Sequence, residues 1–279
     1  MKKISRRSFL AAAGLSVAAL ALTACGGSSS STASSTASSA AASSEAASSS
    51  AAAELTTVEA GKLTMATNAT FPPYEMTTDA GEFEGIDIET AQAIADKLGL
   101  ELQIDDMDFD AALLSVQQGK ADIVMAGVTV TDERKAVMDF SDSYATGIQS
   151  IIVPEGSDIA SPDDLAGKKI GTQRGTTGYI YCSDDFGDDN VVAYDDGLTA
   201  VQALNNGQVD AVVIDNAPAQ EFVAANPGLV ILDTSYAEED YAIGMAKGSS
   251  LEDAVNATLE ELKADGTLQS IVDKYITAE

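Results

Sequence analysis

The sequence predicts an α/β protein whose folded part has two lobes, each built on a mostly parallel sheet. From residue 62 onward, short apolar runs of strand type alternate with segments of helical periodicity, which is typical of parallel sheets. The chain also repeats a pattern, because residues 116–124 (VQQGKADIV) and 204–212 (LNNGQVDAV) both run apolar, two amides, Gly, polar, apolar, Asp, strand. Such an echo between the halves favours two similar lobes over one continuous sheet.

The first half contains strands separated by helices with clear stop signals. Gly99 and Gly119 end two helices, and the apolar run at 123–126 suits a strand buried on both faces. In order, the expected elements are a strand at 62–67, a loop at 68–75, a helix ending at Gly99, a strand at 100–104, a helix at 109–118, a strand at 123–126 and a helix from Thr131.

The second half continues the alternation and adds a helical tail. Gly207 ends a helix there, as Gly119 does in the first half. In order, the expected elements are a strand at 169–172, a helix to about 186, a strand at 191–194, a helix at 198–205, a strand at 209–214, a strand at 241–246, and helices at about 250–264 and 267–276.

Residues 1–25 have the pattern of a lipoprotein signal peptide. A basic start is followed by an apolar run, Phe9 to Ala24, that is short for a membrane span. The motif Leu-Thr-Ala-Cys at 22–25 then matches a lipobox, which predicts cleavage before Cys25 and lipidation of its thiol. A plain transmembrane anchor is the alternative. The segment SRRSFL at 5–10 also resembles a twin-arginine signal, and the sequence leaves the export route open.

Residues 26–53 separate this signal from the predicted fold. They are almost wholly Ser, Ala, Thr and Gly, with Glu45 as their only charge. A segment of this composition cannot bury a core, so it predicts a disordered tether.

The predicted domain is strongly acidic. The chain holds 44 acids and 15 bases; one acid and four bases lie in residues 1–53, which leaves 43 acids and 11 bases, a net charge of −32. Such a surface argues against binding nucleic acid or anionic lipid, and it favours neutral or cationic solutes over acidic ones.

Cysteine and histidine counts exclude several kinds of site. The chain has no His, and Cys182 is the only Cys after Cys25, so the domain cannot form an internal disulfide. Most nucleophile–base arrangements and His- or Cys-based zinc sites also lack their parts. We expect Cys182 to be a small buried residue, with a reactive thiol as the alternative.

Arg134 occupies an unusual position for a cation. Thr131 and the acids after it predict a helix N-cap and first turn, which places Arg134 beside the unpaired amides that open the helix. The helix dipole disfavours a cation there unless an anion lies between them. The alternative is a surface Arg paired with Asp132, Glu133 or Asp139.

Polar candidates gather at the carboxyl ends of the predicted strands, where open parallel sheets bind ligands. Asn68 and Phe71 follow the strand at 62–67, residues 126–134 follow the strand at 123–126, residues 173–177 follow the strand at 169–172, and Asp215 ends the strand at 209–214. This convergence predicts a ligand in a cleft. A buried Asp215 requires a cation, unless it caps a helix from Ala217.

The stretch AGVTVTDERKAVMDFSDSY at 126–144 closely resembles the Thr-x-x-Arg segment of extracellular solute-binding proteins that feed polar amino acids to ABC importers. The resemblance extends over residues 61–276. It implies a type II periplasmic-binding-protein-like fold with the ligand in the interlobe cleft. It also implies that lobe 1 comprises residues 54–146 and 241–279, that lobe 2 comprises residues 147–240, and that hinges lie near 144–148 and 239–243.

The resemblance also implies roles for individual residues. Arg134 would grip the ligand's α-carboxylate, helped by the Thr129 hydroxyl and the backbone of Ala126 and Gly127, and Asp215 would accept the α-ammonium. Around the rest of the ligand, the implied residues are Phe71 and Phe109 flanking the side chain, Asn68 and Gln173 reading its polar groups, and Thr176 and Thr177 binding near the carboxylate. Either Phe could instead be plain core. Relatives that prefer cationic side chains often have an acid at the position of Asn68, and glutamine binders often have Lys at that of Gln173, so the specificity stays open.

The sequence therefore predicts a lipid-anchored, monomeric binding protein on the outer face of the membrane. It would capture a polar L-amino acid and deliver it to an ABC permease without enzymatic activity, cofactor or metal. One alternative is a lyase or dehydratase on the same fold, with Asp215 or Glu75 as a general acid; another is a ligand sensor. A third possibility, calcium at 105–108 or 183–189, lacks EF-hand spacing.

Overall fold

The computed structural model describes residues 55–276, which fall in one compact unit. The predicted signal peptide, the lipidation of Cys25 and the tether at 26–53 lie outside the described residues. None of the helices in the described part is long and apolar enough to cross a membrane.

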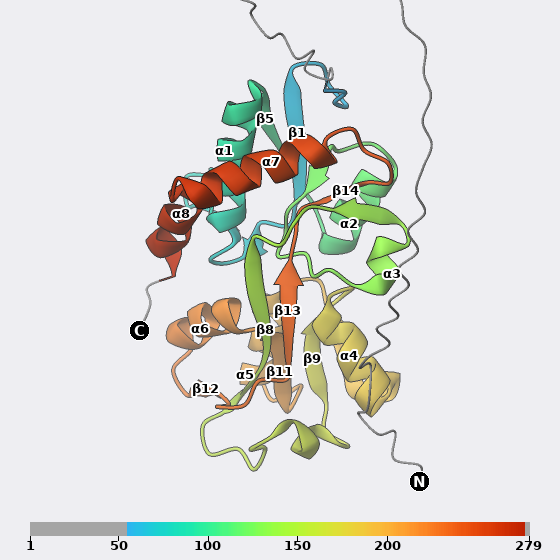
Figure 1. Cartoon of the computed structure of the whole chain (residues 1–279). Helices are drawn as coiled ribbons and strands as arrows, with labels where there is room; N and C mark the ends of the chain where they lie inside the picture. The colour runs from blue at the N-terminus through green and yellow to red at the C-terminus, as the bar shows by residue number, and fades with distance from the viewer. Residues whose placement is uncertain (1–54, 277–279) are drawn as a thin grey trace, which may run out of the picture. The chain divides into compact units, whose positions relative to one another are not determined.

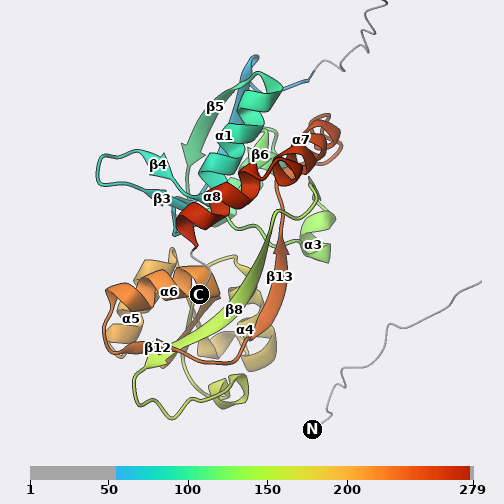
Figure 2. The same cartoon turned by 60° about the vertical axis from the view of Figure 1, so that its left-hand side comes forward.

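The first sheet and its helices come from both ends of the described chain. The strands are β1 (Lys62–Thr67), β5 (Glu101–Asp106), β6 (Ile123–Val124), β7 (Met138–Phe140) and β14 (Gly244–Ala246), and the helices are α1 (Ile86–Leu98), α2 (Phe109–Gln117), α3 (Asp132–Lys135), α7 (Glu252–Ala264) and α8 (Thr267–Tyr275). The strand order is β5-β1-β6-β14-β7. Because successive side chains of β1 point to opposite faces, Leu63 and Met65 pack with α1, α7 and α8, whereas Ala66 packs with α2. Figures 1 and 2 show α1, α7 and α8 side by side.

A small antiparallel sheet follows β1 and brings two cavity residues together. Its strands are β2 (Thr70–Phe71), β3 (Glu75–Thr77) and β4 (Phe83–Glu84), in that order. Phe71 and Glu75 lie opposite each other in it. Gly85, at φ 130°, starts α1, and a Cβ there would lie 2.2 Å from the Tyr74 carbonyl oxygen. Only glycine lets the chain pass this point.

The second sheet contains the middle of the chain. Its strands are β8 (Ala145–Pro154), β9 (Ile170–Gln173), β10 (Val191–Tyr194), β11 (Ala211–Asp215), β12 (Leu229–Ile231) and β13 (Ala237–Tyr241), and its helices are α4 (Thr177–Phe186), α5 (Gly197–Asn205), α6 (Asn216–Ala225) and the 3₁₀ turns η1 (Pro162–Leu165) and η2 (Asp188–Asn190). The order is β10-β9-β11-β8-β12, with β13 paired to another part of β8. One face packs on α4 through Val213, and the other packs on α5 and α6 through Val212 and Ile214.

Both sheets are mixed, which corrects the expectation of mostly parallel sheets. The strands joined by helices are parallel, as expected: β1 with β5 and β6, and β9 with β10 and β11. The remaining pairs are antiparallel: β8 with β11, β12 and β13, and β14 with β6 and β7. The reason is that β8 and β14 each follow a direct crossing from the other sheet, so neither is reached by a helical crossover that would make it parallel.

Two neighbouring segments connect the sheets, and Figure 1 shows β8 and β13 running side by side. The chain leaves the first sheet after β7 and enters the second at β8, and it returns from β13 to β14. The Tyr144 N–H donates to the Tyr241 carbonyl, so the two crossings are hydrogen-bonded to each other. The sequence predicts that these crossings act as hinges and that the lobe boundaries lie at 146/147 and 240/241. Both statements stay predictions.

The single strand expected at 241–246 is wrong, because two strands of different sheets share this segment. Between them, the Ala242 N–H donates to the Val128 carbonyl and the Ile243 N–H to Ser141 Oγ, at 3.1 and 2.9 Å. These bonds replace the ladder hydrogen bonds of a continuous strand. An apolar run can therefore cross from one sheet to another without a break in its hydropathy.

Candidate functional site

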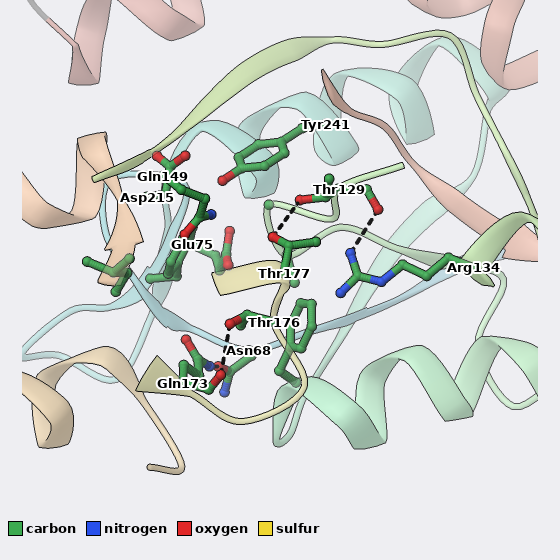
Figure 3. A pocket seen from close by; sticks show the side chains of 15 residues that line it. Asn68, Glu75, Thr129, Arg134, Gln149, Gln173, Thr176, Thr177, Asp215 and Tyr241 are labelled. Atoms are coloured by element: carbon green, nitrogen blue, oxygen red, sulfur yellow. Dashed lines mark hydrogen bonds between the residues drawn. The ribbon is translucent and has the colours of Figure 1, made fainter. Parts of the chain in front are cut away.

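One cavity between the two sheets collects the residues that the sequence pointed to (Figure 3). It is lined by Asn68, Phe71, Glu75, Phe109, Ala126, Gly127, Thr129, Arg134, Gln149, Gln173, Thr176, Thr177, Ile214, Asp215 and Tyr241. All eleven predicted ligand-binding residues are among these fifteen. Their individual roles stay predictions.

Arg134 is buried, and backbone carbonyls rather than carboxylates of the described residues hold its guanidinium. Thr131 Oγ1 accepts the Arg134 N–H at 3.2 Å, so Thr131 caps α3 as predicted. The guanidinium is held by carbonyls, with Nη1 donating to Thr129 O at 2.8 Å and Nη2 to Gly175 O at 3.2 Å. Burial lowers the pKa of Arg134, and the nearby Glu239 carboxylate opposes this shift.

The surface alternative for Arg134 is wrong. Its side chain is only 8% exposed, and no carboxylate within residues 55–276 forms a salt bridge with it. Asp139 pairs with Lys247 at 2.6 Å instead. Two carbonyl contacts leave further N–H groups of the fork free to bind an anion, and Figure 3 shows the guanidinium beside the cavity.

Asp215 is both a cavity residue and a helix cap. Oδ1 accepts the Ala217 N–H at 3.1 Å, which caps α6, and Oδ2 accepts the Ile148 N–H at 2.7 Å. The two interpretations of the sequence are therefore compatible. Burial raises the pKa of Asp215 to about 6, and hydrogen bonds from Tyr241 and the backbone oppose the shift. A carboxylate so poorly solvated gains from a cation beside it.

Gly147 allows β8 to pass close to Asp215. A Cβ at this position would lie 2.7 Å from Asp215 Oδ2 and 2.6 Å from Tyr241 Cζ. Position 147 of β8 therefore has no room for a side chain beside Asp215 and Tyr241. Glycine at 147 thus shapes this end of the cavity.

Asn68, which follows β1 of the first sheet, and Gln173, which ends β9 of the second, meet across the cavity. Gln173 Nε2 donates to Asn68 Oδ1 at 2.8 Å, and Asn68 Nδ2 donates to the Met107 carbonyl at 3.0 Å. Phe71 and Phe109 line the cavity and also belong to the hydrophobic core. The Phe109 ring lies 5.4 Å from the Arg134 guanidinium carbon, a cation–π contact.

The three threonines have distinct contacts. Thr176 caps α4 by accepting the Tyr179 N–H at 3.3 Å, and its hydroxyl donates to Gln173 O at 2.8 Å. The hydroxyls of Thr129 and Thr177 instead point to one carboxylate oxygen, Glu239 Oε2, at 3.1 and 2.9 Å.

A pair of buried acids lies at another side of the cavity. Glu75 is fully buried, and neither of its carboxyl oxygens accepts a hydrogen bond from residues 55–276. Its neighbour Asp87 accepts the Gly127 N–H at 3.0 Å and the Tyr144 hydroxyl at 2.7 Å. Burial, and then the Asp87 charge, raise the pKa of Glu75 well above its ordinary value, and burial raises the pKa of Asp87 to about 6. The cavity therefore has more carboxyl groups than cations.

Comparison with known proteins agrees with this geometry. The family model of bacterial extracellular solute-binding proteins, family 3, matches residues 63–278. The chain belongs to this family. Among its relatives, the L-cystine-binding protein TcyJ of Escherichia coli is 33% identical over 79% of this chain and 85% of that protein. The arginine-binding extracellular protein ArtP of Bacillus subtilis is 33% identical over 78% of this chain and 87% of that protein.

Solved structures share the fold of this solute-binding protein. An ancestral arginine-binding protein bound to arginine is 43% identical, with a TM-score of 0.74 over 77% of this chain and 98% of that one. The two-lobed α/β fold expected from the sequence is thereby confirmed. The family consists of binding proteins rather than enzymes.

Four cavity residues of this solute-binding protein were not among the predicted binders. Gln149 lies on β8, where the sequence analysis expected no strand, and Tyr241 ends β13, whereas the expected strand began at 241. Ile214 precedes Asp215 and was expected only as strand. Glu75 was considered only as a general acid. The sequence signal that could have identified Glu75 as a cavity residue is its position directly after the aromatic and proline residues at 71–74.

Two other expectations can be compared with the described residues. Cys182 is fully buried, as expected, and burial raises the pKa of its thiol to about 12, which makes it unreactive. Within residues 55–276, no group of three or more His, Cys, Asp or Glu side chains is arranged to hold a metal ion.

Proposed function

We propose that this protein binds a polar L-amino acid with a positively charged side chain outside the cell membrane and delivers it, as a monomer, to the permease of an ABC importer. The observation that carries the proposal is the charge arrangement in one cavity. Arg134 suits an α-carboxylate and Asp215 an α-ammonium, the two ends of a zwitterion. Relatives whose names specify arginine and cystine support the amino-acid class.

Glu75 is our reason for choosing a cationic side chain. A ligand's carboxylate and ammonium would engage Arg134 and Asp215, which leaves the Glu75 carboxyl without a counter-charge among the described residues that line the cavity. A guanidinium or ammonium beside it would stabilise the charged form and offset the cost of its burial. The acidic composition of the whole domain adds a weaker preference in the same direction.

The decisive test is a calorimetric titration of the purified protein with arginine, lysine, citrulline, glutamine and glutamate. We expect arginine or lysine to bind at least tenfold more tightly than citrulline, which matches arginine in shape but lacks the charge, and glutamate to bind most weakly. Tenfold corresponds to about 1.4 kcal/mol, a modest value for a buried charged contact. No heat with any amino acid, or tightest binding of glutamate, would reject the proposal.

Two variants test whether Glu75 carries this preference. Glu75→Gln keeps the shape of the side chain and should bring arginine and citrulline to within about threefold of each other. Glu82→Gln, in the exposed loop between β3 and β4, is the matched control and should leave the arginine-to-citrulline ratio unchanged. If the arginine-to-citrulline affinity ratio is the same in the unsubstituted protein and in both variants, Glu75 does not determine the specificity.

We further propose that Cys25 anchors the mature chain to the membrane through lipid, with residues 26–53 as its tether. Cys25→Ala should abolish incorporation of labelled palmitate and release the protein from the membrane fraction without changing arginine affinity. Cys182→Ala removes the only other cysteine and should leave labelling unchanged. Normal membrane retention of Cys25→Ala would contradict lipid anchoring.

A further inference from the structure

Glu239 is a buried carboxylate that lies behind the ligand cavity rather than in it. It is 6% exposed and does not line the cavity described above. It lines a second, outward cavity, which Thr129 also lines. Its neighbours on β13, Glu238 and Asp240, are exposed, because side chains alternate along a strand.

One oxygen of this carboxylate receives three hydrogen bonds from residues that do line the ligand cavity. Glu239 Oε2 accepts from Thr177 Oγ1 at 2.9 Å, from Gln149 Nε2 at 3.0 Å and from Thr129 Oγ1 at 3.1 Å. The two hydroxyl oxygens are 3.4 Å apart. The bonds to the carboxylate are shorter than this separation and charge-assisted, so both hydroxyl protons point to Glu239.

This arrangement decides what the cavity side of these groups can do. A threonine hydroxyl has one proton and two lone pairs, so a hydroxyl that donates to Glu239 can only accept from a ligand. The amide nitrogen of Gln149 also faces Glu239, at 3.0 Å from Oε2. Thr129 and Thr177 therefore present acceptors to the cavity.

We propose that Glu239 is a positioning residue that makes this side of the cavity specific for the ligand's α-ammonium. An ammonium group donates three hydrogen bonds and accepts none, so it matches an acceptor-only surface next to Asp215. A carboxylate, which only accepts, is excluded from the same surface and directed to Arg134. The proposal rests on the proposed function and reassigns Thr129 and Thr177, which the sequence analysis had placed with the carboxylate.

The test compares L-arginine with 5-guanidinopentanoate, which is arginine without its α-ammonium. The unsubstituted protein should bind arginine at least 100-fold more tightly. Glu239→Gln should reduce this ratio at least tenfold, because an amide can donate as well as accept and no longer draws both hydroxyl protons. Glu238→Gln, on the neighbouring exposed position of β13, should leave the ratio unchanged.

A merely structural role for Glu239 would weaken the binding of both ligands equally, and an unchanged ratio in Glu239→Gln would overturn the proposal.

Thr177→Val separates hydroxyl orientation from simple charge attraction. Its effect on the ratio and that of Glu239→Gln should be non-additive in the double variant, and additive effects would overturn the proposal. If Glu239→Gln does not fold, Thr177→Val alone decides the test. It should weaken the binding of arginine and leave the binding of 5-guanidinopentanoate unchanged. Equal loss of both ligands in Thr177→Val would again overturn the proposal. Failure of the proposed function looks different, because the unsubstituted protein would then bind no amino acid.

Discussion

Arg134→Ala is expected to weaken amino-acid binding by about 2–5 kcal/mol, the usual loss when one partner of a buried charged contact is truncated. The guanidinium is almost fully buried, lies beside the cavity and has no salt bridge within the described residues. Its removal would leave a ligand carboxylate without a counter-charge in a poorly hydrated site. Calorimetric titration with arginine, or with whichever amino acid binds most tightly, measures the loss.

Three comparisons show whether the contact is direct. Arg134→Lys should recover only part of the affinity, because an ammonium cannot form the bidentate contact. Arg174→Ala is the matched control, since Arg174 is exposed and pairs with Asp195 on the surface at 3.4 Å. Agmatine, which is arginine without its carboxylate, should bind the unsubstituted protein weakly and lose little more on Arg134→Ala. Equal losses for arginine and agmatine would make Arg134 structural.

Asp215 variants are expected to lose both affinity and stability, in proportions that depend on the substitution. Asp215→Ala removes the proposed ammonium acceptor, the cap of α6 and the acceptor for the Ile148 N–H. It should weaken binding by about 2–5 kcal/mol and lower the free energy of unfolding by about 2–3 kcal/mol. Asp215→Asn keeps one carbonyl oxygen and should lose affinity with a smaller loss of stability. Asp196→Ala removes a comparable cap from α5, at 2.6 Å from the Thr199 N–H, and should lower stability without changing affinity.

The pH dependence provides a second test of Asp215. Because burial raises its pKa to about 6, the group favours the folded state most at low pH, and that contribution is lost as the pH rises through about 6. Ligand affinity should change in the opposite direction, since only the charged form attracts an ammonium, and should fall as the pH drops below about 6. Asp215→Asn should show weak binding that varies little between pH 5 and 7. A pH-independent affinity in the unsubstituted protein would contradict ammonium binding by Asp215.

The cavity lining was predictable because strand ends are readable from sequence. The strand at 62–67 has the same bounds in the structure, and Asp215 ends β11 as expected. Since the carboxyl ends of parallel strands meet at one edge of a sheet, the residues after them converge within each sheet, and the fold then places the two edges on either side of one cavity. The capping of α3 by Thr131 was predictable for a similar reason, because it depends on residues within one helical turn.

The crossing strands could not be predicted in the same way. β8 and β13 pair with each other across about ninety residues of chain, and the register of such a pair is a property of the fold. For this reason the sequence predicted no strand at Glu238-Glu239-Asp240, only a hinge near 239–243, whereas β13 covers 237–241. Because side chains alternate along a strand, Glu239, the middle residue of this segment, is buried. That burial can be predicted only once the segment is known to be a strand.

The sequence by itself determined the family, the two-lobed fold and eleven of the fifteen residues that line the ligand cavity, because local periodicity, strand-end chemistry and the family resemblance point to them. Only the tertiary structure decided which carboxyl groups face the cavity and which lie behind it. Thr129 and Glu239 are 110 residues apart, and Thr177 and Glu239 are 62 apart. The proton of a hydroxyl points to whichever acceptor the fold brings within 3 Å, and no local pattern specifies that acceptor.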